Sequence, residues 1–169
     1  MCITLHLCDT ILGEMDSTER RAHMNLDIIN QPKTITLYGV SKVHDENKDY
    51  SAEIFELLDR VWPEVREKSL AHTGINHVVY DCEDVVFAGI ELKSPDEPET
   101  SLVKMEYTFQ RYAYWKHIGP YSELEDVYNK IFLRIKDLGL TSGCPNMEIY
   151  GHWNNDESKL ETEIYITLE

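Results

Sequence analysis

Aromatic side chains gather in one short stretch of the sequence and offer the clearest means of holding a ligand. Four aromatic residues fall within the ten positions 112–121: Tyr112, Tyr114, Trp115 and Tyr121. They supply more flat apolar surface than one half-buried strand needs, and aromatic faces attract cations by about 0.5–2 kcal/mol. Because successive side chains of a strand point to opposite faces, Tyr114 and Trp115 cannot both reach one cleft if the strand is regular.

Glu163 is the carboxylate that the local pattern singles out. It shares one face of an expected strand with Tyr165, and the aliphatic residues of that strand share the other: Ile164, Ile166 and Leu168. We expect the aliphatic face to pack under helices, which would turn Glu163 toward a cleft. A carboxylate removed from water is costly unless it is paired, so a bound cation would recover part of that cost. The alternative is a solvent-exposed strand glutamate among acidic neighbours.

Other reactive residue types lack the spacing that a site would need. The cysteines form no C-x-x-C pair, so we expect four reduced thiols rather than a zinc site or a disulfide: Cys2, Cys8, Cys82 and Cys144. His117 has no serine, cysteine or second histidine spaced for a catalytic dyad, and it is interpreted as a hydrogen-bonded residue at a strand end. The acidic runs 45–49 and 96–99 lack the ligand pattern of a calcium loop. The sequence therefore predicts no metal and no cofactor.

The charge balance excludes some classes of partner. The chain has 169 residues, with 16 Lys and Arg against 31 Asp and Glu, which gives a formal net charge of −15. Nucleic acids and anionic membranes need a concentrated basic surface, which this sequence lacks. Its longest apolar run, residues 85–90, is far too short to span a membrane. Residues 1–23 lack the basic region of a signal peptide, and we expect a cytoplasmic protein.

The first part of the chain shows a strand, a helix and a hairpin. Alternation over residues 33–43 indicates a strand, and apolar spacing over residues 54–65 indicates a helix with one buried face. Pro63 lies inside that helix and should cause a kink or a break just before it. Two short strands, 75–80 and 85–92, read as a hairpin.

The same order returns after a linker at residues 93–101. Residues 103–117 are extended, with a phase shift near Gln110, and Ser122 and Glu125 could form a capping box at the start of a helix that ends at Gly139. A second hairpin closes the chain over residues 147–153 and 160–168. Trp62 and Tyr128 fall on the apolar faces of their helices and are expected in the core.

These patterns predict an α+β fold made of two β-α-β-β halves, with an antiparallel sheet, helices on one face and a cleft between the halves. The pseudo-repeats cover about 33–93 and 103–169, within one domain at 24–169. Residues 1–23 form an N-terminal extension of unknown role. Interfaces between halves are where ligand sites preferentially form.

The second half resembles the GyrI-like small-molecule-binding domain, the effector-binding domain of bacterial transcription activators. That family shows Tyr-Ala, then His-x-Gly-x-Tyr, a helix, a strand with Glu-x-Tyr and a closing strand Glu-(Ile/Leu)-Tyr-(Ile/Val)-Pro. The matching pieces occur here in the same order: Tyr112-Ala113, His117-Ile118-Gly119-Pro120-Tyr121, Glu148-Ile149-Tyr150 and Glu163-Ile164-Tyr165-Ile166. The duplicated pattern extends the match across roughly 24–169. The chain departs from the family at Thr167, where proline is usual, and lacks a helix-turn-helix segment.

The resemblance implies a tandem SHS2-like fold and a stand-alone protein that binds lipophilic, cationic aromatic compounds. In the family, the glutamate matching Glu163 lies at the floor of the cleft and meets the positive charge of the ligand. Six aromatic residues are candidates for the cleft walls, although each could equally be ordinary core: Tyr165, Tyr150, Tyr114, Trp115, Tyr80 and Phe87.

Two alternatives use the same features differently. Some relatives are thought to hydrolyse reactive electrophilic compounds of the cyclopropane type, and Glu163 beside tyrosines could position and deprotonate a water. The acidic surface could instead bind a protein partner, as the family's association with gyrase inhibition suggests, but the acids are dispersed rather than clustered on one face.

Overall fold

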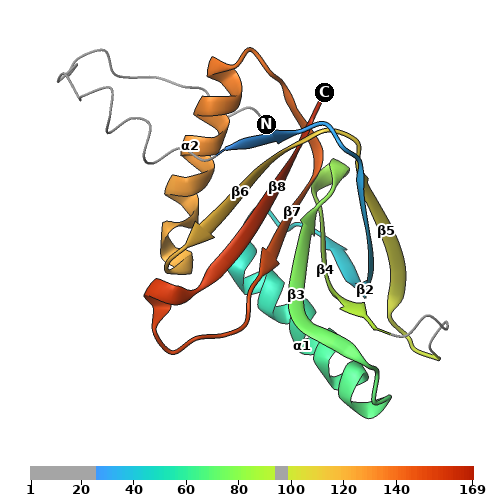
Figure 1. Ribbon diagram of the computed structural model, residues 1–169. Coiled ribbons are helices and arrows are strands. Elements are labelled where there is room, and N and C mark those ends of the chain that lie inside the picture. Colours follow the sequence, from blue (N-terminus) through green and yellow to red (C-terminus); the bar gives the residue numbers. More distant parts are fainter. Residues whose placement is uncertain (1–25, 94–98) are drawn as a thin grey trace.

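One large sheet and two α-helices make up the computed structural model, which describes residues 26–93 and 99–169 (Figure 1). The strands are β1 (Asp27–Ile29), β2 (Lys33–Val43), β3 (His72–Tyr80), β4 (Val85–Leu92), β5 (Val103–Phe109), β6 (Tyr112–Ile118), β7 (Ser142–Tyr150) and β8 (Glu161–Leu168). The α-helices are α1 (Tyr50–Glu67) and α2 (Leu124–Asp137). All strand pairs are antiparallel, in the order β1-β6-β8-β7-β3-β4-β2-β5. Neither α-helix of the described part has the length and apolar character needed to cross a membrane.

The sheet confirms the predicted duplication. The first half consists of β2, α1, β3 and β4, the second half of β6, α2, β7 and β8, and their strands are ordered in the same way about the middle of the sheet. The halves meet where β3 pairs with β7, from Asn76 opposite Tyr150 to Tyr80 opposite Asn146. The α+β fold with an antiparallel sheet and two β-α-β-β halves is thus confirmed.

Two further strands cross between the halves. β1 precedes β2 in the chain but pairs with β6, whereas β5 precedes β6 but pairs with β2. The extended stretch predicted over 103–117 is therefore two strands at opposite parts of the sheet, separated at Gln110 and Arg111, where the phase shifts. Alternation along a strand shows which side chains share a face, but it does not show which strand is the partner.

Both helices lie on the same face of the sheet (Figure 1). α1 packs Ile54 and Leu57 on β3 and β4, and α2 packs Val127 and Ile131 on β6 and β8. The middle of the opposite face is buried because the sheet curls onto itself. This inner core has an aromatic centre, in which the rings of Phe109 on β5 and Tyr165 on β8 lie 5.7 Å apart.

Two predictions about the helices are wrong, and one is confirmed. α1 runs through Pro63, which is exposed, so the predicted break is absent. α2 begins at Leu124 after a 3-10 turn at residues 121–123, so Ser122 does not cap it and the predicted capping box is absent. Gly139 follows α2 with a φ of 67°, the left-handed conformation expected of a C-terminal glycine.

A disulfide between Cys82 and Cys144 contradicts the prediction of reduced thiols for this pair. Cys82 follows β3 and Cys144 lies in β7, so the bond links the two halves beside their shared strand pair. Cysteines far apart in sequence give no spacing signal for such a contact, which depends on the strand register. Cys2 and Cys8, like the whole predicted extension 1–23, lie outside the described residues. The expected cytoplasmic location stays a prediction.

Candidate ligand-binding site

A cavity of about 1050 Å³ lies between the two helices, on the helix side of the sheet. Each helix covers the strands of its own half, which leaves the central strands β3 and β7 partly uncovered. Both halves contribute lining residues: Ile54, Phe55 and Leu58 from α1, Tyr80 from β3, Leu124, Glu125 and Tyr128 from α2, and Glu148 and Tyr150 from β7. The volume is of the order typical of small-molecule sites.

Glu148 is a buried carboxylate in this cavity, with only 3% of its surface exposed. The Tyr80 hydroxyl donates a hydrogen bond to Glu148 Oε2 at 3.0 Å, and the Tyr150 hydroxyl donates to the same oxygen. No Lys, Arg or His lines the cavity, and no ion pair to Glu148 occurs among the described residues. The carboxylate is therefore held by neutral donors only, which leaves its charge without a cationic partner.

The tyrosines around Glu148 are held in their neutral form. Burial raises the pKa of Tyr80 and of Tyr150 well above the usual range, and the neighbouring charge of Glu148 raises both further. Burial, and secondly the charge of Glu148, also raise the pKa of Tyr128 on α2. Neutral phenols can donate hydrogen bonds to a carboxylate, and their rings offer π faces to a cation.

Aromatic pairs flank the cavity in a matching arrangement on each half. The rings of Tyr50 and Tyr80 meet edge to face at 5.4 Å and 81°, and those of Tyr121 and Tyr150 do so at 5.2 Å and 88°. Trp153 adds an indole that is 70% exposed. The cavity thus has aromatic walls in both halves.

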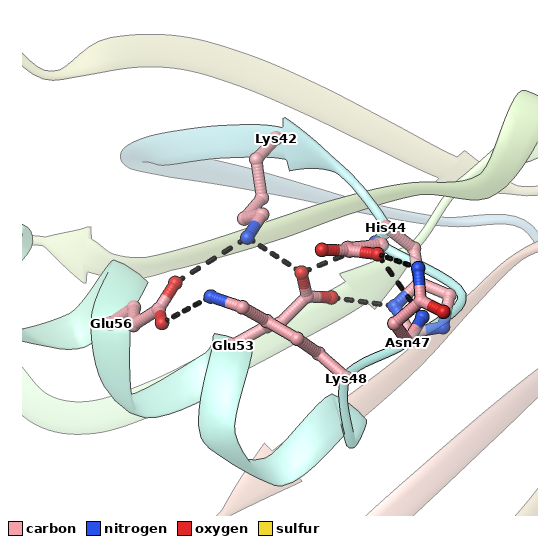
Figure 2. Close-up of polar contacts among 7 residues, drawn as sticks. Lys42, His44, Asn47, Lys48, Glu53 and Glu56 are labelled. Carbon is pink, nitrogen blue, oxygen red and sulfur yellow. Dashed lines mark hydrogen bonds and ion pairs between the residues drawn. The ribbon is translucent and has the colours of Figure 1, made fainter.

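An ionic network fixes the first turn of α1 to the end of β2 (Figure 2). The carboxylate of Glu53 is fully buried and accepts hydrogen bonds from Lys42 Nζ at 2.6 Å and from His44 Nδ1 at 2.5 Å. These bonds lower the pKa of Glu53 to about 2. His44 also stacks on the ring of Tyr50, with centroids 3.8 Å apart. The network therefore positions Tyr50, which lines the cavity.

Glu163 lies on the face of the sheet opposite Glu148. The predicted packing of its strand is confirmed, because Ile164 faces α2, but the large cavity lies on that same helix side. Glu163 accepts a hydrogen bond from Tyr165 at 2.8 Å, and Tyr165 accepts one from Lys33 at 2.7 Å. Glu163 lines a smaller cavity of about 240 Å³. Glu163 therefore does not line the large cavity, and its predicted place in a ligand cleft, like its part in binding, stays a prediction.

The predicted aromatic residues divide between the two faces. Tyr80 and Tyr150 line the large cavity. Tyr165, Phe87 and Tyr114 lie in or against the core on the opposite face: the first two are almost fully buried there. Trp115 packs against the α2 cluster, so Tyr114 and Trp115 do point to opposite faces, as a regular strand requires.

Three other predicted roles can be compared with the structure. His117 is 7% exposed, and its Nε2 lies 3.3 Å from the carbonyl oxygen of Pro120, which confirms a hydrogen-bonded residue at the strand end. Trp62 and Tyr128 pack against the cores of their helices as expected, but Tyr128 also lines the cavity. Within the described ranges no cluster of His, Cys, Asp and Glu could hold a metal ion.

Sequence reasoning missed the place of Glu148 in the cavity, although the sequence contains a signal for it. Glu148 precedes Tyr150 by two residues in a strand, so the two share a face. Because Tyr150 was already a candidate wall residue, Glu148 follows as its neighbour in the same site. Tyr128 is harder to find, because a tyrosine on the apolar face of a helix has the same pattern whether it meets core or cavity.

Three solved structures share this fold. SAV2435 bound to tetraphenylphosphonium has a TM-score of 0.58 at 14% identity, with 86% of this chain and 94% of that chain covered. The EcmrR C-terminal domain has a TM-score of 0.61 at 19% identity, with 86% of this chain and 99% of that chain covered. EcmrR in a complex with DNA has a TM-score of 0.65 at 17% identity, with 90% of this chain and 61% of that chain covered.

Sequence comparison identifies the family directly. No curated protein shows significant sequence similarity to the chain. The family model described as the GyrI-like small molecule binding domain matches residues 20–169, nearly the whole length. Together with the duplicated sheet and the cavity between its helices, this match shows that the chain belongs to the GyrI-like small molecule binding domain family.

Proposed function

We propose that this protein binds lipophilic organic cations in the cavity between α1 and α2, with Glu148 as the counter-charge. The observation that carries the proposal is a buried carboxylate that has only tyrosine hydroxyls as partners in an aromatic cavity. A buried carboxylate without a cation is costly. A bound cation would offset that cost, and an apolar ligand body would fill the cavity.

Glu163 is less suited to the same role because it already has a partial counter-charge. Lys33 reaches it through the Tyr165 hydroxyl, and Lys116 is its cross-strand neighbour. A ligand cation would compete with these groups. Glu148 has no basic neighbour of this kind among the cavity lining residues.

The structural relatives support a cationic ligand by analogy. SAV2435 has this fold and was solved with tetraphenylphosphonium, a hydrophobic cation. A lipophilic cation needs an apolar enclosure and one compensating negative charge, and the cavity around Glu148 offers both.

Calorimetric titration with tetraphenylphosphonium tests the proposal. We expect the native protein to bind it and Glu148→Gln to weaken binding roughly 10- to 100-fold, since an interaction with a charged group contributes about 1.5–3 kcal/mol. Glutamine keeps the volume and can still accept from Tyr80 and Tyr150, so the change removes mainly the charge.

Glu163→Gln is the matched control, because it removes the same charge from the other face of the same sheet. We expect it to bind tetraphenylphosphonium like the native protein. Equal loss in both variants, or loss in Glu163→Gln alone, would move the site to the smaller cavity. No binding by the native protein would overturn the proposal.

A further inference from the structure

The two walls of the cavity can be compared position by position because the chain is duplicated. β3 and β7 have the same length, so alignment from their first residues pairs Tyr80 with Tyr150. The same offset pairs the apolar residues on the packed faces of the helices, which are Ile54, Leu57, Val61 and Val65 in α1 and the half-buried Leu124 with the buried Val127, Ile131 and Ile135 in α2. Each residue of one wall therefore has a counterpart on the other.

Some counterparts are alike, and others differ in polarity. Ile54 and Leu124 are both aliphatic, and Tyr80 and Tyr150 are identical. Where at least one member lines the cavity and both lie in α1 and α2 or in β3 and β7, the pairs that differ in polarity are less polar in the first half: Phe55 and Glu125, Leu58 and Tyr128, Val78 and Glu148. Before these positions, Asp49 and Ser51 are more polar than their counterparts Gly119 and Tyr121. Val78 and Glu148 are also direct partners across the β3–β7 pair. The boundary between the less polar and the more polar wall thus follows the β3–β7 strand pair, where the two halves meet.

We infer that the preferred ligand is an amphiphilic cation with a localised charged head and a separate apolar tail. The head lies against β7 and α2, near Glu148, and the tail lies along α1, against Phe55 and Leu58. This inference rests on the proposed function, and it adds the ligand's shape and orientation. A symmetric cation such as tetraphenylphosphonium would place the same aryl groups on both walls and gain nothing from their difference.

The rim of the cavity is consistent with this orientation. Glu125 lies in the first turn of α2, where it adds a second acid on the side of the proposed head. Asp49 is an acid on the side of the first half, but it is exposed at the start of α1, where solvent and salt screen it. After Tyr50 and Ser51 at the start of α1, the helix bounds the cavity with the apolar side chains of Ile54, Phe55 and Leu58.

The affinities of hexyl-, octyl- and decyltrimethylammonium, measured below their micelle-forming concentrations, distinguish the contribution of the tail from that of the head. The head is constant in this series, so the change in affinity per methylene reports the surroundings of the tail. A fully buried methylene strengthens binding about fourfold. We expect the native protein to gain two- to fourfold per methylene.

Phe55→Glu should abolish most of the gain in affinity per methylene, because it places on α1 the residue type that α2 has at the matching position, Glu125. Phe55 is 69% exposed, so the substitution leaves the fold intact, which a melting curve verifies. Glu125→Phe is the mirror variant. We expect it to weaken all three ligands by the same factor and to leave the gain per methylene unchanged. Leu133→Glu, 62% exposed on α2, controls for an added carboxylate outside the cavity.

The outcomes distinguish this inference from the proposed function. If the native protein binds tetraphenylphosphonium but Phe55→Glu keeps the full gain per methylene, the orientation is wrong while the proposed function stands. If Glu125→Phe instead loses the gain in affinity per methylene, the tail lies on α2, and the inference is overturned. If neither tetraphenylphosphonium nor the alkyl series binds, the proposed function fails, and the inference fails with it.

Discussion

Single residues at the cavity floor combine to keep a negative charge in an apolar place. Glu148 accepts from Tyr80 and Tyr150, and both hydroxyls can donate only while they are protonated. Burial and the carboxylate itself keep them so, by raising their pKa values. Both phenols therefore stay hydrogen-bond donors to the carboxylate in the cavity.

Spectrophotometric titration of the tyrosines tests this arrangement. Burial raises the pKa of each of five tyrosines above the ordinary value of 10.0: Tyr80, Tyr107, Tyr128, Tyr150 and Tyr165. We expect these phenols to stay protonated in the folded protein at about pH 11. Because the unfolded chain would release those protons from about pH 10 upward, stability should fall with rising pH in this range. Full phenolate absorbance from a protein that is still folded at about pH 11 would contradict the prediction.

At the level of the elements, α1 is anchored at its first turn by a buried ion network. Glu53 holds Lys42 and His44 at the end of β2, and His44 stacks on Tyr50 of the cavity (Figure 2). The position of this cavity wall therefore depends on charges that are not themselves in the cavity.

Acid unfolding of Glu53→Gln tests the anchor. Hydrogen bonds from Lys42 and His44 lower the pKa of Glu53 from 4.5 to about 2. A lowered folded-state pKa means that the stabilisation is complete above about pH 4.5 and is lost as the pH falls toward about 2. We expect the variant to melt lower at neutral pH and to lose less stability across that acid range. Glu67→Gln, at the exposed end of α1, should match the native protein, and identical acid profiles for both variants would refute the anchor.

Local patterns predicted the elements well and their long-range relations poorly. The strand at 33–43 and the hairpin around residues 81–84 follow from alternation and turn residues, and both are present. The aliphatic residues of β8 do face α2, so the relative orientation of Glu163 also followed from the sequence. The cavity lies on the helix side of the sheet because the two helices leave a gap there. The residue pattern of a single strand cannot predict that gap. The disulfide and the crossing of β1 and β5 are likewise contacts between distant segments.

For the whole molecule, the disulfide is a covalent link between the halves. It joins residues 62 positions apart, and closing a loop of that size stabilises a fold by about 4 kcal/mol in the chain-entropy estimate. We expect Cys82→Ser with Cys144→Ser to lower the free energy of unfolding in urea by up to about that amount. Thiol labelling of the denatured but unreduced protein of native sequence should leave Cys82 and Cys144 unmodified. Labelling of all four cysteines would show that the bond is absent.

The crossing of β1 and β5 has a consequence for how such a protein can arise. A half-length chain could build this sheet only as two copies that exchange their first strands, because β1 completes the second half and β5 the first. Two identical copies would carry the same residue at every matched position. In a fused gene each half mutates independently, so a valine opposite a glutamate at Val78 and Glu148 is a difference that a dimer of identical halves cannot carry.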